Sequence, residues 1–509
     1  MPNRYSLGLI LFLAYIYAFT GVHSDDFIHI TQPYTQNLGV MFKEIFTNPL
    51  LLKGVTTALI NLSQFTLFKT NFVLYDIVKV FISFFFFYSC FLFFLDYVGK
   101  QKSALISLFI LLYPSHDATN YWVTGEYFLT TMTFIFLSHY LINHQKYLSG
   151  FGAGILGAFA SYASLPFNLG LSLIFLAKKE YKKFILFLTP QLLYVMFYFI
   201  SSRFLHEKSA IKGSGDFSIW VLIKQFILQI GTGLDAVVGP SLFLKVYYSL
   251  QSLTWLSIVI CTVVVWIFYT FYKPEKNRVD GAFTLSLFCI VLSAFGIFAL
   301  TGLYPQIAFN LGDRVTIYGS VIVSFVLVMY GMENKKIATL LFTTFLFSIV
   351  GISDHWKSWN KTQLQIMERI AKNSHLKAFD TTKQLFVSHH QYSKLGVISH
   401  IEFFAEGIPH QVFKIATQKD YNVSTLNQRF YYDGEKIVDK KYGTTFEVGE
   451  TISVYDSFGD KLLSIKKEDI NAYIASLPKE NRHWVQLLDR ENFIMKMVLT
   501  LMPRLEYAL

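Results

Sequence analysis

The sequence predicts a mainly α-helical, polytopic membrane protein with a small α+β domain at its carboxy-terminal end. Three observations predict this fold class. Of the 509 residues, 53% are hydrophobic, 18% are aromatic and only 15% are charged, whereas soluble domains usually carry about 25% charged residues. Long apolar runs recur as far as Ile352. From Ser353 onward the composition becomes mixed, and short strand-like runs begin.

Apolar runs long enough to cross a bilayer, with tilting or buried ends allowed, predict about eleven transmembrane helices. Two of the runs are short, so the sequence does not define where these two helices begin and end. The runs are Ser6–Thr20, Leu74–Val98, Ala104–Tyr113, Tyr127–Ile142, Leu148–Leu165, Leu169–Ala177, Phe184–Ser202, Leu253–Tyr272, Ala282–Leu300, Val315–Met332 and Ile337–Ile352.

Two long segments between these runs leave the number of spans open. Gly21–Val73 contains moderately apolar stretches broken by charged residues and proline, which is typical of helices lying at the membrane interface. Arg203–Gln251 contains two apolar stretches, Phe217–Ile230 and Leu234–Leu250. These are interfacial helices, re-entrant helices or an extra pair of spans, and the last reading gives about thirteen transmembrane helices.

The distribution of charge predicts the orientation and argues against a nucleic-acid partner. The chain carries a net charge of +10, but the part from Ser353 onward has 21 Lys and Arg against 19 Asp and Glu. The excess lies in alternate short loops of the apolar part, as in proteins with positively charged cytoplasmic loops. The lysines and arginines of these loops are Lys100, Lys102, Lys146, Lys178, Lys179, Lys182, Lys183, Lys273, Lys276, Arg278, Lys335 and Lys336.

With these loops and Arg4 inside, an odd number of spans places the carboxy-terminal domain outside the cytoplasm. The first run also resembles a signal peptide that ends at Val22-His23-Ser24. An aromatic-rich run followed at once by an acidic pair fits a retained first helix better, and either reading leaves Asp25 outside. The three cysteines, Cys90, Cys261 and Cys289, lie in apolar runs without metal-ligand spacing, which is typical of small hydrophobic core residues.

The region 353–509 is predicted to form a separate α+β domain, apart from a membrane module of residues 1–352. Helical spacing covers Trp356–Phe379 and a stretch near Lys467–Leu477, and an apolar stretch, Phe493–Met502, ends the chain. Asp433-Gly434 and Phe458-Gly459-Asp460 are turn signals between strand-like runs. These runs are Gln384–Ser388, Gln411–Ile415, Thr445–Val448 and Ile452–Tyr455.

The strongest local signal for chemistry is Asp25-Asp26, directly after the first apolar run and flanked by His23 and His29. Carboxylates at a membrane face need water, a cation or a partner. Two adjacent carboxylates repel each other, which raises one pKa or recruits a cation. Such a group can accept the proton of a hydroxyl nucleophile or ligate a divalent metal. The alternative is a purely structural role, as a polar cap where a helix leaves the membrane.

Two further groups of polar residues are predicted on the same side of the membrane. His116, Asp117 and Glu126 supply possible acids, bases or ligands, although their spacing is not diagnostic of a metal site. Arg314 follows Asp313 at the mouth of an apolar helix, where a guanidinium suits bidentate binding of a phosphate; an Asp–Arg pair closing the helix is the alternative. Arg203 faces the same side and is expected to share the task.

The order of these predicted elements resembles the GT-C glycosyltransferase superfamily. The chain begins with a first span and an outer loop that opens on an acidic pair. Interfacial helices, many further spans and an outer carboxy-terminal domain follow. Asp25 and Asp26 carry the resemblance, with Asp117 or Glu126 as second acidic members, over roughly Met1–Ile352. Within the superfamily the chain resembles bacterial members that glycosylate envelope glycans or pilins. The pair lacks an Asp-x-Asp spacing, so the use of a divalent cation as cofactor is left open.

The resemblance implies an integral protein of the bacterial inner membrane that acts as a hexosyl- or pentosyltransferase. It implies transfer from a polyprenyl-phosphate-linked sugar to a glycan or protein acceptor outside the cytoplasm. Asp25 or Asp26 is expected to act as the base, with Arg314 and Arg203 binding the donor phosphate. Because nucleotide sugars are made in the cytoplasm and the candidate acids face outward, a donor has to cross as a lipid conjugate. A flippase or transporter for lipid-linked sugars or polysaccharides, an envelope glycan polymerase and a non-catalytic scaffold or receptor are the alternatives.

Overall fold

The computed structural model describes residues 3–204, 218–275, 279–301, 305–489 and 491–501. These residues form two compact units. The first unit comprises Met1–Ala18, Tyr34–Ala308 and Gly312–His355, and the second comprises Phe19–Pro33, Phe309–Leu311 and Trp356–Leu509. The second unit therefore combines the carboxy-terminal region with two short segments that lie among the apolar runs.

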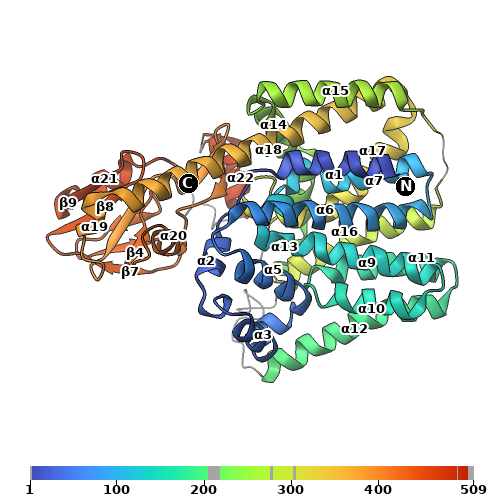
Figure 1. The fold of residues 1–509 in the computed structure, drawn as a ribbon, viewed down its shortest axis with the longest axis horizontal. Helices are drawn as coiled ribbons and strands as arrows, with labels where there is room; N and C mark the ends of the chain where they lie inside the picture. Colours follow the sequence, from blue (N-terminus) through green and yellow to red (C-terminus); the bar gives the residue numbers. More distant parts are fainter. Residues whose placement is uncertain (1–2, 205–217, 276–278, 302–304, 490, 502–509) are drawn as a thin grey trace. The chain divides into compact units, whose positions relative to one another are not determined.

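The first unit is a bundle of helices, many of which run side by side in Figure 1. Within it, α6 packs against α1, α7 and α9, and α11 packs against α12 and α16. The helices are α1 (Asn3–Tyr17), α3 (Leu38–Thr47), α4 (Pro49–Leu52), α5 (Val55–Phe68), α6 (Phe72–Leu95), α7 (Lys100–Leu111), α8 (Ala118–Tyr121), α9 (Tyr127–Asn143), α10 (Tyr147–Ala158), α11 (Ser164–Ala177), α12 (Tyr181–Phe204), α13 (Ile219–Val238), α14 (Pro240–Gln251), α15 (Trp255–Phe271), α16 (Gly281–Thr301), α17 (Ile317–Tyr330) and the start of α18 (Lys335–Lys372). Short 3-10 turns η2 (Pro114–His116), η3 (Val123–Glu126), η4 (Leu311–Thr316) and η5 (Gly331–Glu333) connect some of them.

The apolar character of these helices confirms the predicted fold class. The described residues include 6 helices that are long and apolar enough to cross a membrane, together with shorter apolar helices such as Ser6–Tyr17 and Trp255–Phe271. Each predicted apolar run overlaps a helix of the first unit, although Leu148–Leu165 extends past the end of α10 into the start of α11. The protein is therefore an integral membrane protein, and the exact number of spans stays a prediction.

Of the segment that the sequence left open, 217–250, residue 217 lies outside the described residues, and the rest contains two consecutive helices, α13 and α14. Gly239 between them is extended, with φ −103° and ψ −163°, and Pro240 starts α14. Proline fits the first turn of a helix because its missing N–H would have no partner there. The stretch Ile219–Gln251 is one candidate span by length and composition, and the choice between interfacial helices, re-entrant helices and an extra pair of spans stays open.

The second unit is built around a four-stranded sheet with the order β4-β1-β8-β9. Strand β1 (Leu385–Ser388) is parallel to β4 (Val423–Thr425) and to β8 (Thr451–Asp456), and β9 (Lys461–Lys466) is antiparallel to β8. Phe386, Ile452 and Val454 from this sheet pack in one apolar core with Ile470 and Ile474. The residues belong to strands β1 and β8 and to helix α21 (Ile470–Ser476).

Two smaller sheets and several helices complete this unit. The antiparallel sheets are β2 (Tyr392–Leu395) with β3 (Ile398–Glu402), and β5 (Phe430–Tyr432) with β6 (Lys436–Asp439) and β7 (Thr445–Glu447). The helices are α2 (Asp25–Thr31), the end of α18, α19 (Ser374–Ala378), α20 (Ile408–Thr417), α21 and α22 (Phe493–Leu501), with 3-10 turns η1 (Pro33–Thr35, its last residues counted in the first unit), η6 (Lys467–Asp469) and η7 (Trp484–Leu487).

The structure corrects one predicted strand and confirms the turn signals. Gln411–Ile415 was expected as a strand, but it belongs to the helix α20. Pro409 lies in the first turn of this helix, and Ile408, Val412 and Phe413 are buried, which is a helical rather than an alternating spacing. Gly434, with φ 110°, turns the chain between β5 and β6.

Candidate active site

A tightly turned loop precedes the predicted catalytic pair. Three residues of this loop have positive φ angles, Phe19 at 65°, Gly21 at 69° and Ser24 at 52°. A Cβ on Gly21 would lie 2.2 Å from Asn360 Oδ1, and Asn360 Nδ2 donates to the carbonyl of Phe19 at 2.9 Å. Positive φ is unfavourable for residues other than glycine and persists only where the surroundings enforce it. The loop is therefore held in one shape.

Asp25 and Asp26 form the first turn of α2, where acidic side chains are favoured by the helix dipole. Asp26 is fully buried, and its Oδ2 accepts a hydrogen bond from the backbone N–H of His23 at 2.9 Å. Asp25 is partly exposed. The two neighbours thus differ: Asp26 helps to shape the loop, and Asp25 has the accessibility that a proton acceptor needs.

Of the two histidines around the pair, His23 is buried and His29 is partly buried. His23 lies against Trp356, with ring centroids 4.6 Å apart, and its Nε2 is 2.6 Å from the carbonyl oxygen of Thr20. Burial lowers the pKa of His29 to about 4, so this ring is neutral at pH 7. The neutral His29 therefore supplies no positive charge to stabilise the neighbouring carboxylates.

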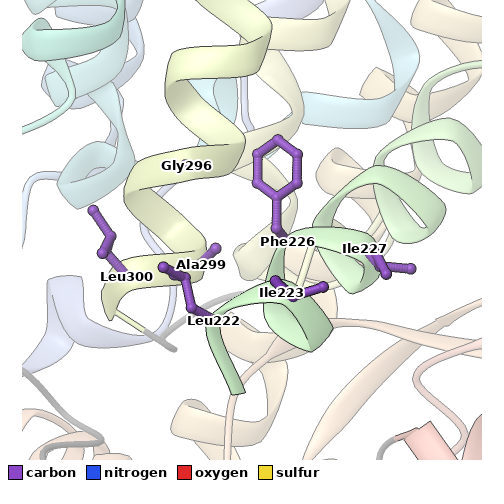
Figure 2. Close-up of a pocket in the computed structure, with 7 residues that line it drawn as sticks. All are labelled: Leu222, Ile223, Phe226, Ile227, Gly296, Ala299 and Leu300. Atoms are coloured by element: carbon purple, nitrogen blue, oxygen red, sulfur yellow. The ribbon is translucent and has the colours of Figure 1, made fainter. Parts of the chain in front are cut away.

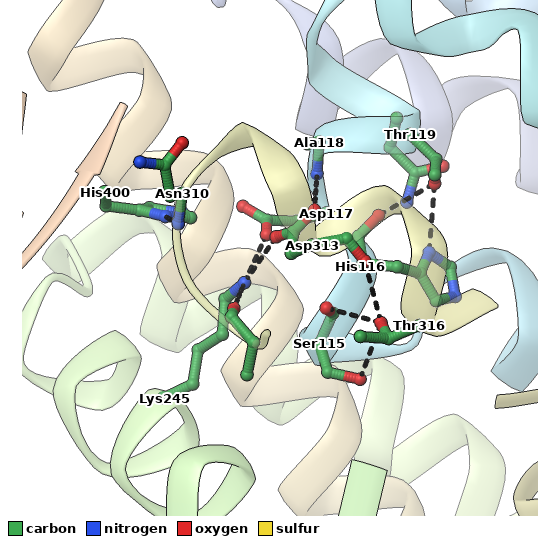
Figure 3. A network of polar contacts seen from close by, with 12 residues as sticks. Ser115, His116, Asp117, Ala118, Thr119, Lys245, Asn310, Asp313, Thr316 and His400 are labelled. Carbon is green, nitrogen blue, oxygen red and sulfur yellow. Dashed lines mark hydrogen bonds and ion pairs between the residues drawn. The ribbon is translucent and has the colours of Figure 1, made fainter. Parts of the chain in front are cut away.

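In the first unit, the structure brings Asp117 and Asp313 together around Lys245 of α14 (Figure 3). Lys245 Nζ donates to a carboxylate oxygen of Asp117, to Asp313 Oδ2 at 2.9 Å and to the carbonyl of Ala308. All three charged side chains have no exposed surface. Two buried carboxyl groups share one buried ammonium, so this network is an electrostatically demanding arrangement.

Backbone and hydroxyl groups fix the orientation of this network. The backbone N–H of Ala118 donates to Asp313 Oδ1 at 3.2 Å. Thr316 Oγ1 donates to the carbonyl of Ser115 at 2.7 Å and to that of Asp313 at 2.9 Å. These bonds join η2 and α8 to η4. The two turns that carry Asp117 and Asp313 are therefore locked together.

His116 adjoins the network, and its imidazole ring is uncharged at neutral pH. The ring is fully buried, and its Nδ1 is 2.9 Å from Thr119 Oγ1. Burial is the main cause that lowers the pKa of His116 to about 4. Thr119 Oγ1 also donates to the carbonyl of His116 at 2.8 Å. His116 is thus neutral and oriented by its own turn.

Arg314 follows Asp313 in η4 and is partly exposed. Its Nε donates to the hydroxyl of Tyr127 at 3.1 Å, and its guanidinium carbon lies 5.1 Å from the ring of Trp122. The neighbouring Asp313 carboxylate binds Lys245, and Tyr127 and Trp122 help to orient Arg314. A guanidinium held over an aromatic ring is well suited to bind a planar or tetrahedral anion.

Glu126 and Arg203 are the remaining predicted site residues. Glu126, at the end of η3, is buried. The side chain of Arg203 lies outside the described residues. Asp25 and Asp26 belong to the second unit, whereas Asp117, Glu126 and Arg314 belong to the first. Their convergence on one site stays a prediction.

An apolar cavity of about 340 Å³ lies between α13 and α16 of the first unit (Figure 2). Its lining residues all have apolar side chains or none. They are Leu222, Ile223, Phe226, Ile227, Gly296, Ala299 and Leu300. Such a surface can hold hydrocarbon, but it offers no acid, base or anion-binding group.

Two features of possible chemical use are missing from the sequence prediction. Lys245 lies in the apolar stretch Leu234–Leu250 without a local pattern that marks it, yet it is the centre of the buried network. The second feature lies in the carboxy-terminal region, for which no site residue is predicted. In the structure His389 Nδ1 lies 2.9 Å from Asp456 Oδ1, where the parallel strands β1 and β8 end. The ends of parallel strands are a common position for polar sites.

Among solved structures, the chain is similar to ArnT from Cupriavidus metallidurans, whose crystal structure is bound to undecaprenyl phosphate. The match has 10% sequence identity and a TM-score of 0.43, and it covers 84% of this chain and 86% of that chain. No family model and no curated protein matches the sequence. The function therefore has to be inferred from the residues of this chain.

Proposed function

We propose that this protein is a membrane glycosyltransferase of the GT-C superfamily. It moves a sugar from a polyprenyl-phosphate-linked donor to an envelope glycan or protein acceptor, on the extracytoplasmic face of a bacterial inner membrane. The observation that carries the proposal is the acidic pair Asp25-Asp26, placed in the first turn of α2 directly after the first apolar helix and behind a strained loop. Strained backbone is typical of functional sites.

The reaction proposed is attack of an acceptor hydroxyl on the anomeric carbon of the donor sugar. The new glycosidic bond forms as the bond from the anomeric carbon to the lipid phosphate breaks. Asp25 accepts the hydroxyl proton, because its neighbour Asp26 is engaged by the His23 backbone. The departing lipid phosphate takes the negative charge, which a guanidinium can stabilise.

Arg314 is the residue proposed to bind this phosphate, with Arg203 as a second candidate. The Arg314 guanidinium is oriented by Tyr127 and Trp122 and is partly exposed. The apolar cavity between α13 and α16 supports a lipid-linked donor, because it is an apolar surface of a kind that a polyprenyl chain can cover.

The proposal is tested with purified protein in lipid nanodiscs, given a radiolabelled polyprenyl-phosphate sugar and a panel of envelope glycan and pilin-peptide acceptors. Transfer of label to an acceptor is the expected result. Reconstitution in sealed vesicles adds a second readout, the movement of donor across the bilayer. Movement of intact donor without transfer would contradict the proposal and favour the transporter alternative.

Arg314→Lys is expected to weaken the binding of donor substantially, because a point charge replaces a planar group that can bind phosphate through two N–H bonds. The measurement is the apparent donor affinity in the transfer assay, compared with Arg314→Ala. Arg369→Lys, in the part of α18 that belongs to the second unit, is the matched control. Unchanged donor affinity in Arg314→Ala would show that Arg314 is structural only.

The proposed orientation predicts that Lys179 is cytoplasmic and Asp433 extracytoplasmic. Both residues are exposed, so Lys179→Cys and Asp433→Cys should react readily with a membrane-impermeant maleimide. In intact spheroplasts only Asp433→Cys is expected to be labelled, and lysis should expose both. A background without the native Cys90, Cys261 and Cys289 is the control. Labelling of Asp433→Cys only after lysis would reverse the orientation and remove the site assignment.

A further inference from the structure

The second unit contains a polar cavity of about 220 Å³ that none of the preceding assignments uses. It lies between the edge strand β4 and the three-stranded sheet β5-β6-β7, beside the start of α20. The lining residues are Glu406, Gly407, Ser424, Thr425, Arg429, Phe430, Asp439, Tyr442, Thr444 and Phe446. All of them belong to the same unit, so the cavity is a property of that unit alone.

Arg429 is the central cation of this cavity. Its Nη2 donates to Asp439 Oδ2 at 2.8 Å, and the side chains of Arg429 and Asp439 are only 13% and 5% exposed. The guanidinium carbon also lies 5.4 Å from the ring of Phe430 and 5.3 Å from the ring of Tyr442. An ion pair and two aromatic neighbours therefore hold the guanidinium in place.

Glu406 forms a second fixed polar group at the rim. Its Oε1 accepts hydrogen bonds from Lys441 Nζ at 2.9 Å and from the Tyr442 hydroxyl at 2.5 Å. Burial raises the pKa of Glu406, but these bonds and the nearby Arg429 lower it more, so the pKa lies below its usual value. Glu406 also has a positive φ of 52°. The carboxylate is thus ionised and positioned by strained backbone.

Two buried polar atoms of the cavity lining have no hydrogen-bond partner among the described residues, Thr425 Oγ1 and Arg429 Nε. Thr425 is only 3% exposed. Buried polar groups are nearly always hydrogen-bonded, and an exception calls for a ligand, a water or a functional reason. An unused hydroxyl and an unused N–H donor on two residues that line the cavity fit a ligand that both donates and accepts hydrogen bonds.

The charges of the cavity indicate a neutral ligand. Arg429 and Lys441 are balanced by Glu406 and Asp439, so no excess positive charge remains to attract a phosphate or a carboxylate. The volume is below the roughly 300–1,000 Å³ that is typical for drug-sized ligands. A single sugar ring matches both the size and the mixture of donors, acceptors and aromatic edges from Tyr442 and Phe446.

We propose that this cavity binds one neutral sugar residue of the acceptor glycan. The cavity would select the acceptor, while the transfer chemistry takes place elsewhere. The acceptor role rests on the proposed function, whereas the binding of sugar in the cavity does not. The two can therefore be tested separately, first by binding and then by kinetics.

The binding test uses the full-length protein in nanodiscs and saturation-transfer NMR with the methyl glycosides of glucose, galactose, rhamnose and N-acetylglucosamine. Binding of at least one glycoside is expected. Thr425→Val keeps the shape and the β-branching but removes the hydroxyl, and should weaken binding about 2- to 12-fold, as for loss of one hydrogen bond. Thr451→Val, at an exposed position of β8, is the matched control and should bind like the wild type.

Several outcomes would overturn the proposal. The absence of binding by all four glycosides would do so, as would equal binding by wild type and Thr425→Val. Inorganic phosphate is the anion probe. If the wild type bound phosphate and Thr425→Val did not, the ligand of the cavity would be an anion and not a neutral sugar. Glycoside binding by a protein that shows no transfer would leave the sugar site standing and remove the proposed glycosyltransferase function.

The kinetic test applies once a glycan acceptor is found. Thr425→Val should raise the KM for the acceptor by the same factor of about 2 to 12, and leave kcat and the donor KM unchanged. Tyr442→Phe, which removes the hydroxyl bond to Glu406, should act in the same direction. A fall in kcat with an unchanged acceptor KM would assign the cavity to the stability of the fold or to catalysis and would overturn its role in acceptor binding.

Discussion

Asp25→Asn is expected to lower sugar transfer about a hundred- to ten-thousand-fold, which is the usual contribution of a general base. The variant keeps the size of the side chain and removes its charge. Asp25 is partly exposed at the start of α2, so the folded protein should tolerate the change. The loss should therefore appear in kcat and not in the yield of folded protein.

Asp26→Asn should behave differently because Asp26 is buried and bound to the backbone N–H of His23. An asparagine oxygen can still accept this bond, but a neutral acceptor forms a weaker one. We expect a smaller loss of transfer together with a lower thermal midpoint. The contrast between the two variants separates the base from the residue that shapes the loop.

The measurement is transfer from a polyprenyl-phosphate sugar by purified Asp25→Asn, Asp26→Asn and the double variant. Asp469→Asn, at an exposed position of the second unit, is the control for a lost carboxylate. Near-normal turnover by the double variant would eliminate the mechanism. Activity that is lost and then rescued by a different divalent metal would reassign the pair to metal binding.

Lys245→Met is expected to be the most destabilising single substitution among those considered. It leaves the buried carboxylates of Asp117 and Asp313 without their shared ammonium. Removing one partner of a buried ion pair typically costs about 3–5 kcal/mol. Expression should fall, and the remaining protein should unfold at a lower temperature in detergent. Lys224→Met changes an exposed lysine of α13 and should have little effect.

A triple variant, Lys245→Met with Asp117→Asn and Asp313→Asn, removes all the charges together. Because replacing a complete buried ion network by neutral groups is often tolerated, much of the lost stability should return. Transfer by this variant then decides the role of the network. Normal transfer would make the network structural, and a folded but inactive protein would place it in the chemistry. A triple variant no more stable than Lys245→Met would contradict the electrostatic explanation.

The helices of the membrane unit could be predicted because their signal is local. A run such as Leu74–Val98 is apolar throughout, and hydrocarbon requires a helix whose backbone groups bond to one another. The corresponding helix, Phe72–Leu95, differs by a few residues at each end. In the second unit the same local reasoning located β1, β7 and β8 but misassigned Gln411–Ile415, because this short run leaves out Ile408, whose spacing to Val412 is helical.

The polar networks could not be predicted because their partners are far apart in the sequence. Lys245 is 128 residues from Asp117 and 68 residues from Asp313. A lysine in an apolar helix indicates that a partner exists, but not which acidic residue it is. Arg429 and Glu406 of the cavity present the same difficulty. By contrast, Asp25-Asp26 could be proposed from the sequence because two acidic residues directly after an apolar helix form a local pattern.

The position of Lys245 also bears on how the chain is assembled. A lysine in an apolar membrane segment opposes insertion, by up to about 2.5–3.5 kcal/mol at the centre of a helix, and Lys245 lies in α14, near the end of the apolar stretch Ile219–Gln251. During synthesis Asp117 has already emerged from the ribosome when α14 appears, whereas Asp313 follows 68 residues later. We therefore expect α14 to enter the bilayer against the helices already made, and to reach its final place only after the segment carrying Asp313 has been translated.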